Sequence, residues 1–378
     1  MLHPYKNYPY TSFWSKSVVY DFDPTSIILP DSPLLRRTDK VMSAGSCFAA
    51  NIVPYIEAAG LEYIRTEKKH PIHQRCPPEN YGYENFSAAY GHIYTVRQLL
   101  QLIKRALGLF HPIEDRLSEN GRIIDVFRPG LRYPAASDVE FDLLNKKHLD
   151  AVSVAFKKCD VFIFTLGLTE AWMSRTDGSV YPVCPGTIAG AFDPEKHRFI
   201  NFSAAEVIDD LIQFLDILRD LNPNVRVVLS VSPVPLIATA TSRHVVTANS
   251  YSKAVLRVAV DEIARRYEFV RYFPAYEIIT GPQAPNDFWE SDRRNPSRSG
   301  IEAVMKAFSY CCELTQDGAL EANISTSPHE SLSDRVQAHP SFSGADAAES
   351  EVAVLLSRQI VSAECEEAMI NQIDNIRK

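Results

Sequence analysis

The chain has 378 residues, of which 46% are hydrophobic and 23% are charged, and its formal net charge is −8. This composition is typical of a globular protein, and the acidic balance argues against nucleic-acid binding, because neutralising phosphates requires clustered Lys and Arg. Seven scattered cysteines, no apolar run near the roughly 20 residues of a membrane span and no secretory signal lead us to expect a cytoplasmic protein.

Apolar residues at helical spacing and in short continuous runs predict alternating strands and helices. In chain order these are a strand over 40–46, a helix to about 60, a helix from 95, a helix over 148–158, a strand over 161–166, a helix over 203–221, a strand over 225–231, a helix over 250–267, a strand over 269–273 and a helix over 299–314. The strand over 225–231 is apolar on both faces, as in a parallel sheet covered by helices. The alternation therefore predicts an α/β fold with a mostly parallel sheet.

The composition divides the chain into three parts. We expect one α/β domain over 1–316 with two insertions. One is near 66–92, where the sequence is polar and irregular, and the other is near 111–147, where polar and apolar residues alternate in short stretches. Residues 317–347 are rich in Ser, Ala, Asp and Pro, which predicts a flexible linker. Residues 348–378 contain a second amphipathic stretch, and we expect a C-terminal helix that docks on the domain or forms a homo-oligomer or partner contact.

Unusual turns follow several predicted strands. They are Gly45-Ser46-Cys47, Gly167-Leu168-Thr169-Glu170, Ser232-Pro233-Val234-Pro235 and the segment 274–296. Ligands of open α/β sheets bind beyond the carboxyl ends of the strands. These turns are therefore expected to converge on one site.

Ser46 is the first candidate for chemistry. A serine on a sharp turn between a strand and a helix is where a hydrolase places a nucleophile. The plainer interpretation is that Ser46 caps the helix. Cys47 is a rival, because a helix N-terminus lowers a thiol pKa, although a buried and inert cysteine is the plainer expectation.

Several motifs in order resemble a known family. Gly45-Ser46-Cys47-Phe48-Ala49, the Ser-Pro-Val-Pro turn, Tyr272-Phe273-Pro274-Ala275-Tyr276-Glu277 and Asp292-x-x-x-Pro296-Ser297 are similar to the GSCFA family, over roughly residues 35–315. That family is similar to the SGNH/GDSL hydrolases. The resemblance implies a flavodoxin-like three-layer α/β/α fold, to which the amphipathic C-terminal stretch would add a helical extension. It also implies an ester hydrolase or acyltransferase acting on a carbohydrate or other hydroxylated metabolite, with no cofactor and no metal.

The resemblance also implies roles for particular residues. Ser46 stands at the nucleophile, and Asp292 matches the aspartate of the Asp-x-x-His block. The oxyanion hole would be formed by the N–H groups of Ser46 and Gly91, with Gly82 as a rival, and by Thr169, which stands where the family pattern has Asn. Asn295 stands where the pattern has the catalytic His.

Asparagine at 295 leaves three interpretations open. An amide does not titrate, so Asn295 can hydrogen-bond Ser46 but cannot take its proton. The chain is then a catalytically silent binding module, or it carries an engineered replacement that traps substrate, or another histidine serves as the base. His92 and His244 are the candidates for that third case.

Four further side chains are assigned to substrate binding. His92 lies beside Gly91, Glu170 can bind a substrate hydroxyl, Trp172 can stack on a sugar, and Arg294 can hold an anionic group. The plainer interpretations are capping or ion pairing for Glu170, core packing for Trp172 and pairing with the acidic surface for Arg294.

Overall fold

The computed structural model describes residues 3–19, 22–28, 33–68, 86–119, 121–129, 134–187 and 190–313. Its helices are α1 (Trp14–Ser17), α2 (Cys47–Ala50), α3 (Ile52–Ala58), α4 (Val96–Ala106), α5 (Asp138–Lys158), α6 (Ala204–Leu221), α7 (Val245–Arg266), α8 (Ala275–Thr280) and α9 (Arg298–Tyr310). Its strands are β1 (Lys40–Gly45), β2 (Glu62–Tyr63), β3 (Arg116–Glu119), β4 (Arg122–Asp125), β5 (Val161–Leu166), β6 (Glu170–Ser174), β7 (Val180–Tyr181), β8 (His197–Asn201), β9 (Arg226–Val231) and β10 (Val270–Phe273). The predicted linker and C-terminal helix lie outside the described residues.

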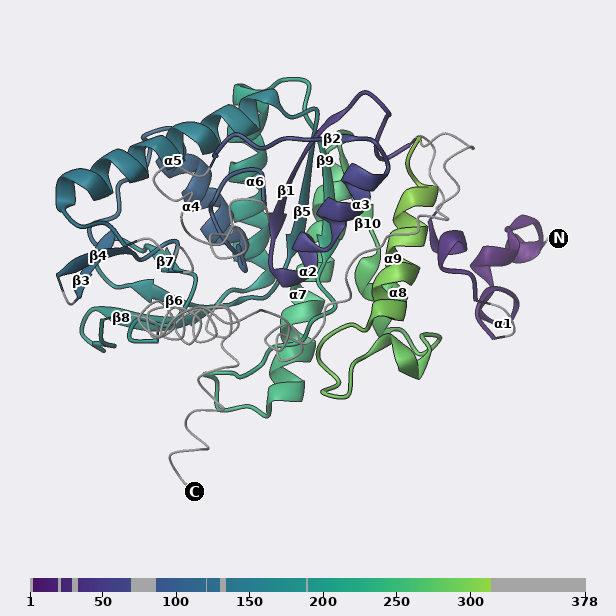
Figure 1. Ribbon diagram of the computed structural model, residues 1–378. Coiled ribbons are helices and arrows are strands. Elements are labelled where there is room, and N and C mark those ends of the chain that lie inside the picture. Colours follow the sequence, from purple (N-terminus) through teal and green to yellow (C-terminus); the bar gives the residue numbers. More distant parts are fainter. Residues whose placement is uncertain are drawn as a thin grey trace, which may run out of the picture. The chain divides into compact units, whose positions relative to one another are not determined.

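A parallel sheet of five strands forms the centre of the domain (Figure 1). Its order is β10-β9-β5-β1-β2, and all four neighbouring pairs are parallel. Counted along the chain, these strands stand in the order 5-4-3-1-2, which is the flavodoxin-like order read from the other edge. The predicted α/β fold is confirmed.

Alternation along the strands divides the core into two layers. Met42 of β1 and Phe162 and Phe164 of β5 face one side of the sheet, where they pack among residues of α4 to α7. Val41 and Ile163 face the other side, toward α3, α8 and α9. Because successive side chains of a strand point to opposite faces, both faces of β1 and β5 are apolar and both are covered. Figure 1 shows the two groups of helices on either side of the sheet.

The segment 111–147, expected to be an insertion, contains regular structure. β3 and β4 form an antiparallel pair, and α5 begins at Asp138, well before the predicted start at His148. Ser137 caps this helix by accepting a hydrogen bond from the N–H of Glu140. Arg116 of β3 pairs with Asp138 and Asp142 of α5, so the hairpin is attached to the first turns of the helix.

A second sheet was not predicted. β6 pairs with β7 and with β8 in an antiparallel arrangement. It follows directly from the turn after β5, since β6 begins at Glu170. The sequence around it mixes polar and aromatic residues without a clean period of two, which is why periodicity did not reveal it.

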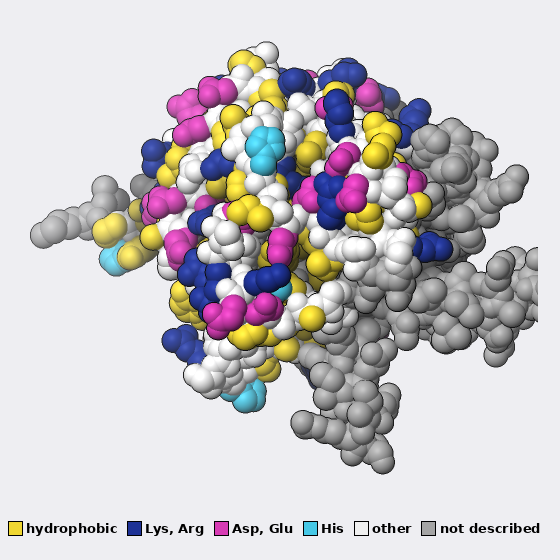
Figure 2. Space-filling view, turned by 90° about the vertical axis from the view of Figure 1, so that its left-hand side faces the viewer, with side chains coloured by type: hydrophobic (Ala, Val, Ile, Leu, Met, Phe, Trp, Pro, Cys, Tyr) yellow, Lys and Arg dark blue, Asp and Glu magenta, His cyan; other side chains and the backbone are white. Residues whose placement is uncertain are grey.

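The surface is mixed in charge where Figure 2 shows it. Acidic and basic side chains of the described residues are interspersed on this face, without a continuous basic strip among them. Among the described residues, no helix combines the length and the apolar composition needed to cross a membrane.

The central strand generates a stability prediction. Phe162 is fully buried and contacts the rings of Phe156 and Phe214. Replacing it by alanine in Phe162→Ala removes these contacts and leaves a cavity, which costs about 3–5 kcal/mol. Urea unfolding measures this, with the exposed Val258→Ala as the control. A loss for Phe162→Ala no larger than that of the control would contradict the central position of β5.

Candidate active site

Ser46 directly follows β1, at the point where the strand order reverses. β1 lies between β5 and β2, so the crevice beyond its carboxyl end is the switch point of the sheet. Gly45 has φ +149°, and a Cβ there would lie 2.6 Å from the Cβ of Ala49 and 2.8 Å from the carbonyl oxygen of Thr165. Only glycine fits between the neighbouring strand and the following helix. This tight turn places Ser46 at the switch point.

Ser46 occupies the cap position of α2 without capping it. Its backbone is extended, with φ −88° and ψ −166°, and its side chain makes no capping hydrogen bond. The residue is 7% exposed. The side chain of Ser46 therefore does not cap the helix. The side chain of Cys47 lies outside the described residues.

The segment 91–94 is held between two strand-end turns. The N–H of Ile93 donates to the carbonyl of Gly45 at 2.9 Å. The carbonyl of Tyr94 accepts from the N–H groups of Gly167 and Leu168, at 3.1 and 3.0 Å. Gly91, at φ +68°, begins this segment, and its N–H donates to no acceptor among the described residues. The segment is thus fixed beside Ser46. Gly82, the rival for the same role, lies outside the described residues.

Thr169 is engaged inside the protein. It is fully buried, its hydroxyl donates to Oδ1 of Asn201 at 2.7 Å, and its N–H donates to Oγ of Ser252 at 3.0 Å. A hydroxyl has one hydrogen to donate. In this arrangement the Thr169 side chain cannot stabilise an oxyanion without releasing Asn201, so its expected role is not supported.

Asn201 is a polar residue at the site that the sequence did not reveal. It lies at the end of β8, opposite Glu170 in the register of the small sheet. Its Oδ1 accepts the Thr169 hydroxyl, which directs the amide nitrogen away from Thr169. No motif marks it, because it reaches the site through the second sheet.

Lys253 of α7 is a second residue that the sequence did not reveal. Its side chain is 1% exposed, and Nζ donates to the carbonyl of Gly167 at 2.6 Å. Burial, together with the nearby charge of Arg294, lowers the pKa of Lys253 to about 7. Lys253 and its neighbour Ser252 together attach the turn after β5 to α7. No pattern predicts it, since a lysine inside an amphipathic helix is normally exposed.

Asp292 and Asn295 are hydrogen-bonded to each other. Nδ2 of Asn295 donates to Oδ2 of Asp292 at 2.7 Å, and Oδ1 of Asp292 accepts the N–H groups of Arg294 and Asn295. Burial raises the pKa of Asp292, but these hydrogen bonds outweigh burial and lower the pKa below its usual value. Arg293 between them has φ +57°, the one non-glycine residue at positive φ among those described. The turn therefore holds the Asn295 amide in one orientation, with Nδ2 on Asp292.

These contacts connect the predicted turns in series. Ser46 is joined to the segment 91–94, that segment to the turn after β5, and this turn to Lys253, which lies within electrostatic range of Arg294. These links agree with the expected convergence for three of the four turns, and for the turn 232–235 it stays a prediction. That Ser46 and Asn295 face each other across the site stays a prediction.

Glu170 and Trp172 have structural contacts. Oε1 of Glu170 accepts from the Thr239 hydroxyl at 2.7 Å, and its Oε2 accepts from the N–H of Ala240. The indole of Trp172 packs edge-on against Phe192 and Phe199, with centroids 5.0 and 5.6 Å apart. These contacts correspond to the plainer interpretations, capping of a turn and aromatic packing, and not to the substrate-binding roles expected from the sequence.

The two histidines considered as the base differ in position. His244 is exposed, and its Nδ1 accepts the N–H of Val246 as the cap of α7. His92 lies in the segment beside Ser46, and its ring is near those of Phe86 and Tyr94. His92 is therefore the better placed of the two. Among the described residues, no group of three or more His, Cys, Asp or Glu has the arrangement of a metal site.

Comparisons with known proteins agree with the motifs. The GSCFA family model matches residues 40–308. No curated protein matches the chain. Similar solved structures include an acetyl esterase mutant with an acetate ion (TM-score 0.33, 14% identity, 71% of this chain and 94% of that one). Two family 3 carbohydrate esterases are also similar. The enzyme of Clostridium thermocellum has a TM-score of 0.31 and 13% identity, with 72% of this chain and 93% of that one covered. The enzyme of Talaromyces cellulolyticus has a TM-score of 0.28 and 14% identity, with 71% and 94% covered. At these TM-scores the structures establish neither a shared substrate nor a shared mechanism.

The buried lysine generates a pH prediction. Lys253 has a pKa near 7 in the folded state, against about 10.4 in the unfolded chain. Between these pKa values only the unfolded chain holds the proton. The free energy of unfolding therefore rises with pH by up to about 1.4 kcal/mol per pH unit. Below pH 7 the folded protein also holds the proton, and the destabilisation caused by the buried charge is at its full size. Lys253→Met lacks this contribution.

Urea unfolding of both proteins between pH 6 and pH 9.5 measures the difference. The stability of the wild type relative to Lys253→Met should increase with pH above about 7. For Lys306→Met, a control at an exposed lysine, the free energy of unfolding should change with pH as it does in the wild type. A constant difference across this range would show that Lys253 keeps an ordinary pKa.

Proposed function

Because the chain belongs to the GSCFA family, we propose that it is a serine esterase or acyltransferase whose nucleophile is Ser46. The proposed substrate is an acyl ester of a carbohydrate or another hydroxylated metabolite. The observation that carries this proposal is the position of Ser46. It stands at the switch point of a parallel sheet, on a turn that only glycine permits, with a hydroxyl that is not engaged in capping.

The proposed reaction proceeds through an acyl-serine. With no general base at 295, the proton of Ser46 Oγ passes to solvent water as Oγ bonds to the ester carbonyl carbon, and the carbonyl oxygen becomes an oxyanion. Collapse of the oxyanion breaks the bond to the alcohol oxygen, which takes a proton from water as it leaves, and an acyl group remains on Ser46. Water, or the hydroxyl of an acceptor, then takes the acyl group in the reverse sequence. The N–H groups of Ser46 and Gly91 are the proposed oxyanion donors.

The residue at 295 limits the rate of this reaction. With Nδ2 on Asp292, the Asn295 amide presents its oxygen as an acceptor, which can orient the Ser46 hydroxyl but cannot hold a proton. A positioned general base normally contributes about 10²–10⁴ to the rate. We therefore expect a slow enzyme in the form given by this sequence.

A silent binding module is the second candidate function. The hydrogen bonds of Asp292 to Asn295 favour it, because they form an ordered turn that needs no histidine. In this case the pocket would bind an ester or glycan without cleaving it. The same experiment separates the two functions.

Restoring a base at 295 tests the proposal. In Asn295→His the imidazole replaces an amide of similar size beside Asp292, and it can accept the Ser46 proton. We expect faster labelling of Ser46 by a fluorophosphonate and faster turnover of p-nitrophenyl acetate, by about 10²-fold or more.

Two controls define the outcome. Ser46→Ala in the Asn295→His background should abolish both signals, and Asn295→Gln should leave them at the wild-type level. If circular dichroism shows that the Asn295→His protein is folded but it does not react, the enzyme proposal is contradicted and the binding module remains.

A further inference from the structure

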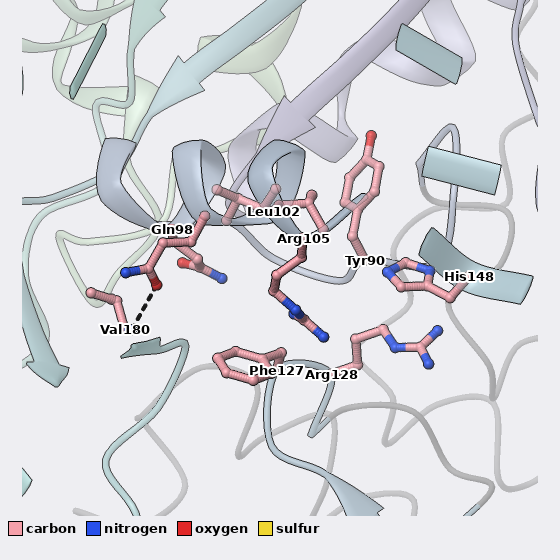
Figure 3. A pocket seen from close by; sticks show the side chains of 10 residues that line it. Tyr90, Gln98, Leu102, Arg105, Phe127, Arg128, His148 and Val180 are labelled. Atoms are coloured by element: carbon pink, nitrogen blue, oxygen red, sulfur yellow. Dashed lines mark hydrogen bonds between the residues drawn. The ribbon is translucent and has the colours of Figure 1, made fainter. Parts of the chain in front are cut away.

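A small pocket lies on the far side of the segment that flanks Ser46. It is bordered by α4, α5, the residues after β4 and the strand β7 (Figure 3). The space open to the centre of a water molecule is about 20 Å³. A single water needs roughly 10–15 Å³ by this measure, so the pocket accepts a group of only a few heavy atoms.

Most polar groups of the wall are already satisfied. The amide of Gln98 donates to the carbonyl of His92 and accepts from the N–H of Tyr94. The amide of Gln101 likewise bonds Gly178 and Val180. Two wall residues remain: Nε2 of His148 is buried without a hydrogen-bond partner among the described residues, and Arg105 makes one long hydrogen bond.

Arg105 is a buried cation with few partners among the described residues. It is 7% exposed, and its guanidinium lies 4.0 Å from the centre of the Phe127 ring. Its one hydrogen bond to a described residue is a long one, 3.4 Å to Oδ1 of Asn145. No described carboxylate forms an ion pair with it. Burial of a guanidinium is costly unless an anion or several acceptors compensate it.

The nearby carboxylates belong to another arginine. Arg128 pairs with Asp125 at 2.7 Å and with Glu67 at 3.4 Å. Glu67 also accepts the N–H of Ala89. The positive charge of Arg128 is therefore matched inside the cluster, and the charge of Arg105 is felt by Asp125 only at longer range.

The imidazole of His148 is the second polar group of the pocket wall that can bind a ligand. Its Nδ1 lies 2.6 Å from Oε2 of Glu67, and its Nε2 is buried without a hydrogen-bond partner among the described residues. Burial lowers the pKa of His148, and Arg128 lowers it further, while Glu67 and Asp125 raise it in part. The ring is therefore neutral at pH 7, with Nδ1–H on Glu67 and a bare Nε2. Figure 3 shows the imidazole and the Arg105 guanidinium on the wall of the same pocket.

We propose that this pocket binds a small free carboxylate, of the size of formate or acetate, between Arg105 and His148. One carboxylate oxygen accepts from the Arg105 guanidinium, and the other accepts from Nε2–H of a protonated His148. The alkyl end faces the apolar wall formed by Leu102 and Val180. The positive charges of Arg105 and Arg128 and the negative charges of Glu67 and Asp125 cancel. The negative charge of the bound carboxylate is therefore neutralised by the proton that His148 takes up.

The pocket is distinct from the Ser46 site but shares a wall with it. Tyr90, Ile93 and Gln98 line the pocket, and the N–H of Ile93 is bonded to Gly45 beside Ser46. The proposal does not depend on Ser46 acting as a nucleophile. It rests on the buried Arg105 and His148 alone.

Binding is tested on the full chain with acetate and with pivalate, a carboxylate too bulky for the pocket, at equal ionic strength. Acetate should raise the melting temperature saturably and pivalate should not, by the linkage of ligand binding to stability. The effect should be larger at pH 5.5 than at pH 7.5, because binding takes up a proton. The ¹⁵N resonance of His148 Nε2 should shift toward the protonated value only when acetate is added.

Three variants complete the test. Arg105→Gln should weaken acetate binding at least tenfold, and Val180→Leu, which fills the pocket and keeps Arg105, should weaken it similarly. Arg122→Gln, at an exposed position of β4, should bind as the wild type does. The proposal would be overturned if acetate and pivalate changed the melting temperature equally, or if both pocket variants still bound acetate. Crystals grown in acetate that hold only water in the pocket would also overturn it.

Discussion

The close approach of β1 and β5 at Gly45 is the constraint on which the site depends. There is no room for a side chain at this point, because Ala49 and the Thr165 carbonyl would both lie within 3 Å of a Cβ. The strand must therefore turn sharply, and the first residue that carries a side chain beyond it is Ser46. The carbonyl of Gly45 is in turn the acceptor for Ile93, so the same turn fixes the segment that bears Gly91.

Helix α7 performs the corresponding task for the turn after β5. Ser252 accepts the N–H of Thr169, and Lys253 donates to the carbonyl of Gly167. These bonds are buried, where a hydrogen bond is stronger and a missing partner is costly. The site is thus built on backbone positions that are fixed by contacts between distant parts of the chain. Arg293, the one non-glycine residue at positive φ in the described part of the chain, is held by the hydrogen bonds of Asp292 to its neighbours.

Much of the fold was predictable from the sequence because the strands of the main sheet are short apolar runs between amphipathic helices. The strand 161–166 and the helix 203–221 agree with β5 and α6 to within about a residue. The position of Ser46 was predictable for the same reason, since it ends an apolar run at a glycine. The small sheet was not predictable, because its strands lack a clean period of two. The early start of α5 was missed as well, and there Arg116 adds tertiary ion pairs to the local cap by Ser137.

The roles of individual site residues were less predictable than their positions. Thr169 lies in the predicted turn, but the partner of its hydroxyl, Asn201, is remote in the sequence. Glu170 and Trp172 likewise found partners that no spacing indicates. Lys253 resembles an ordinary helix residue, and only the packing of α7 against the turn buries it. A sequence specifies which residues stand at a strand end more readily than it specifies what they bond.

The central claim is that Ser46 is the nucleophile of a slow esterase. Mass spectrometry of the unmodified chain after long incubation with p-nitrophenyl acetate tests it most directly. The account predicts one added acetyl group, located on the peptide that contains Ser46. An absence of acetylation, or acetyl groups found only on lysines or cysteines, would contradict it.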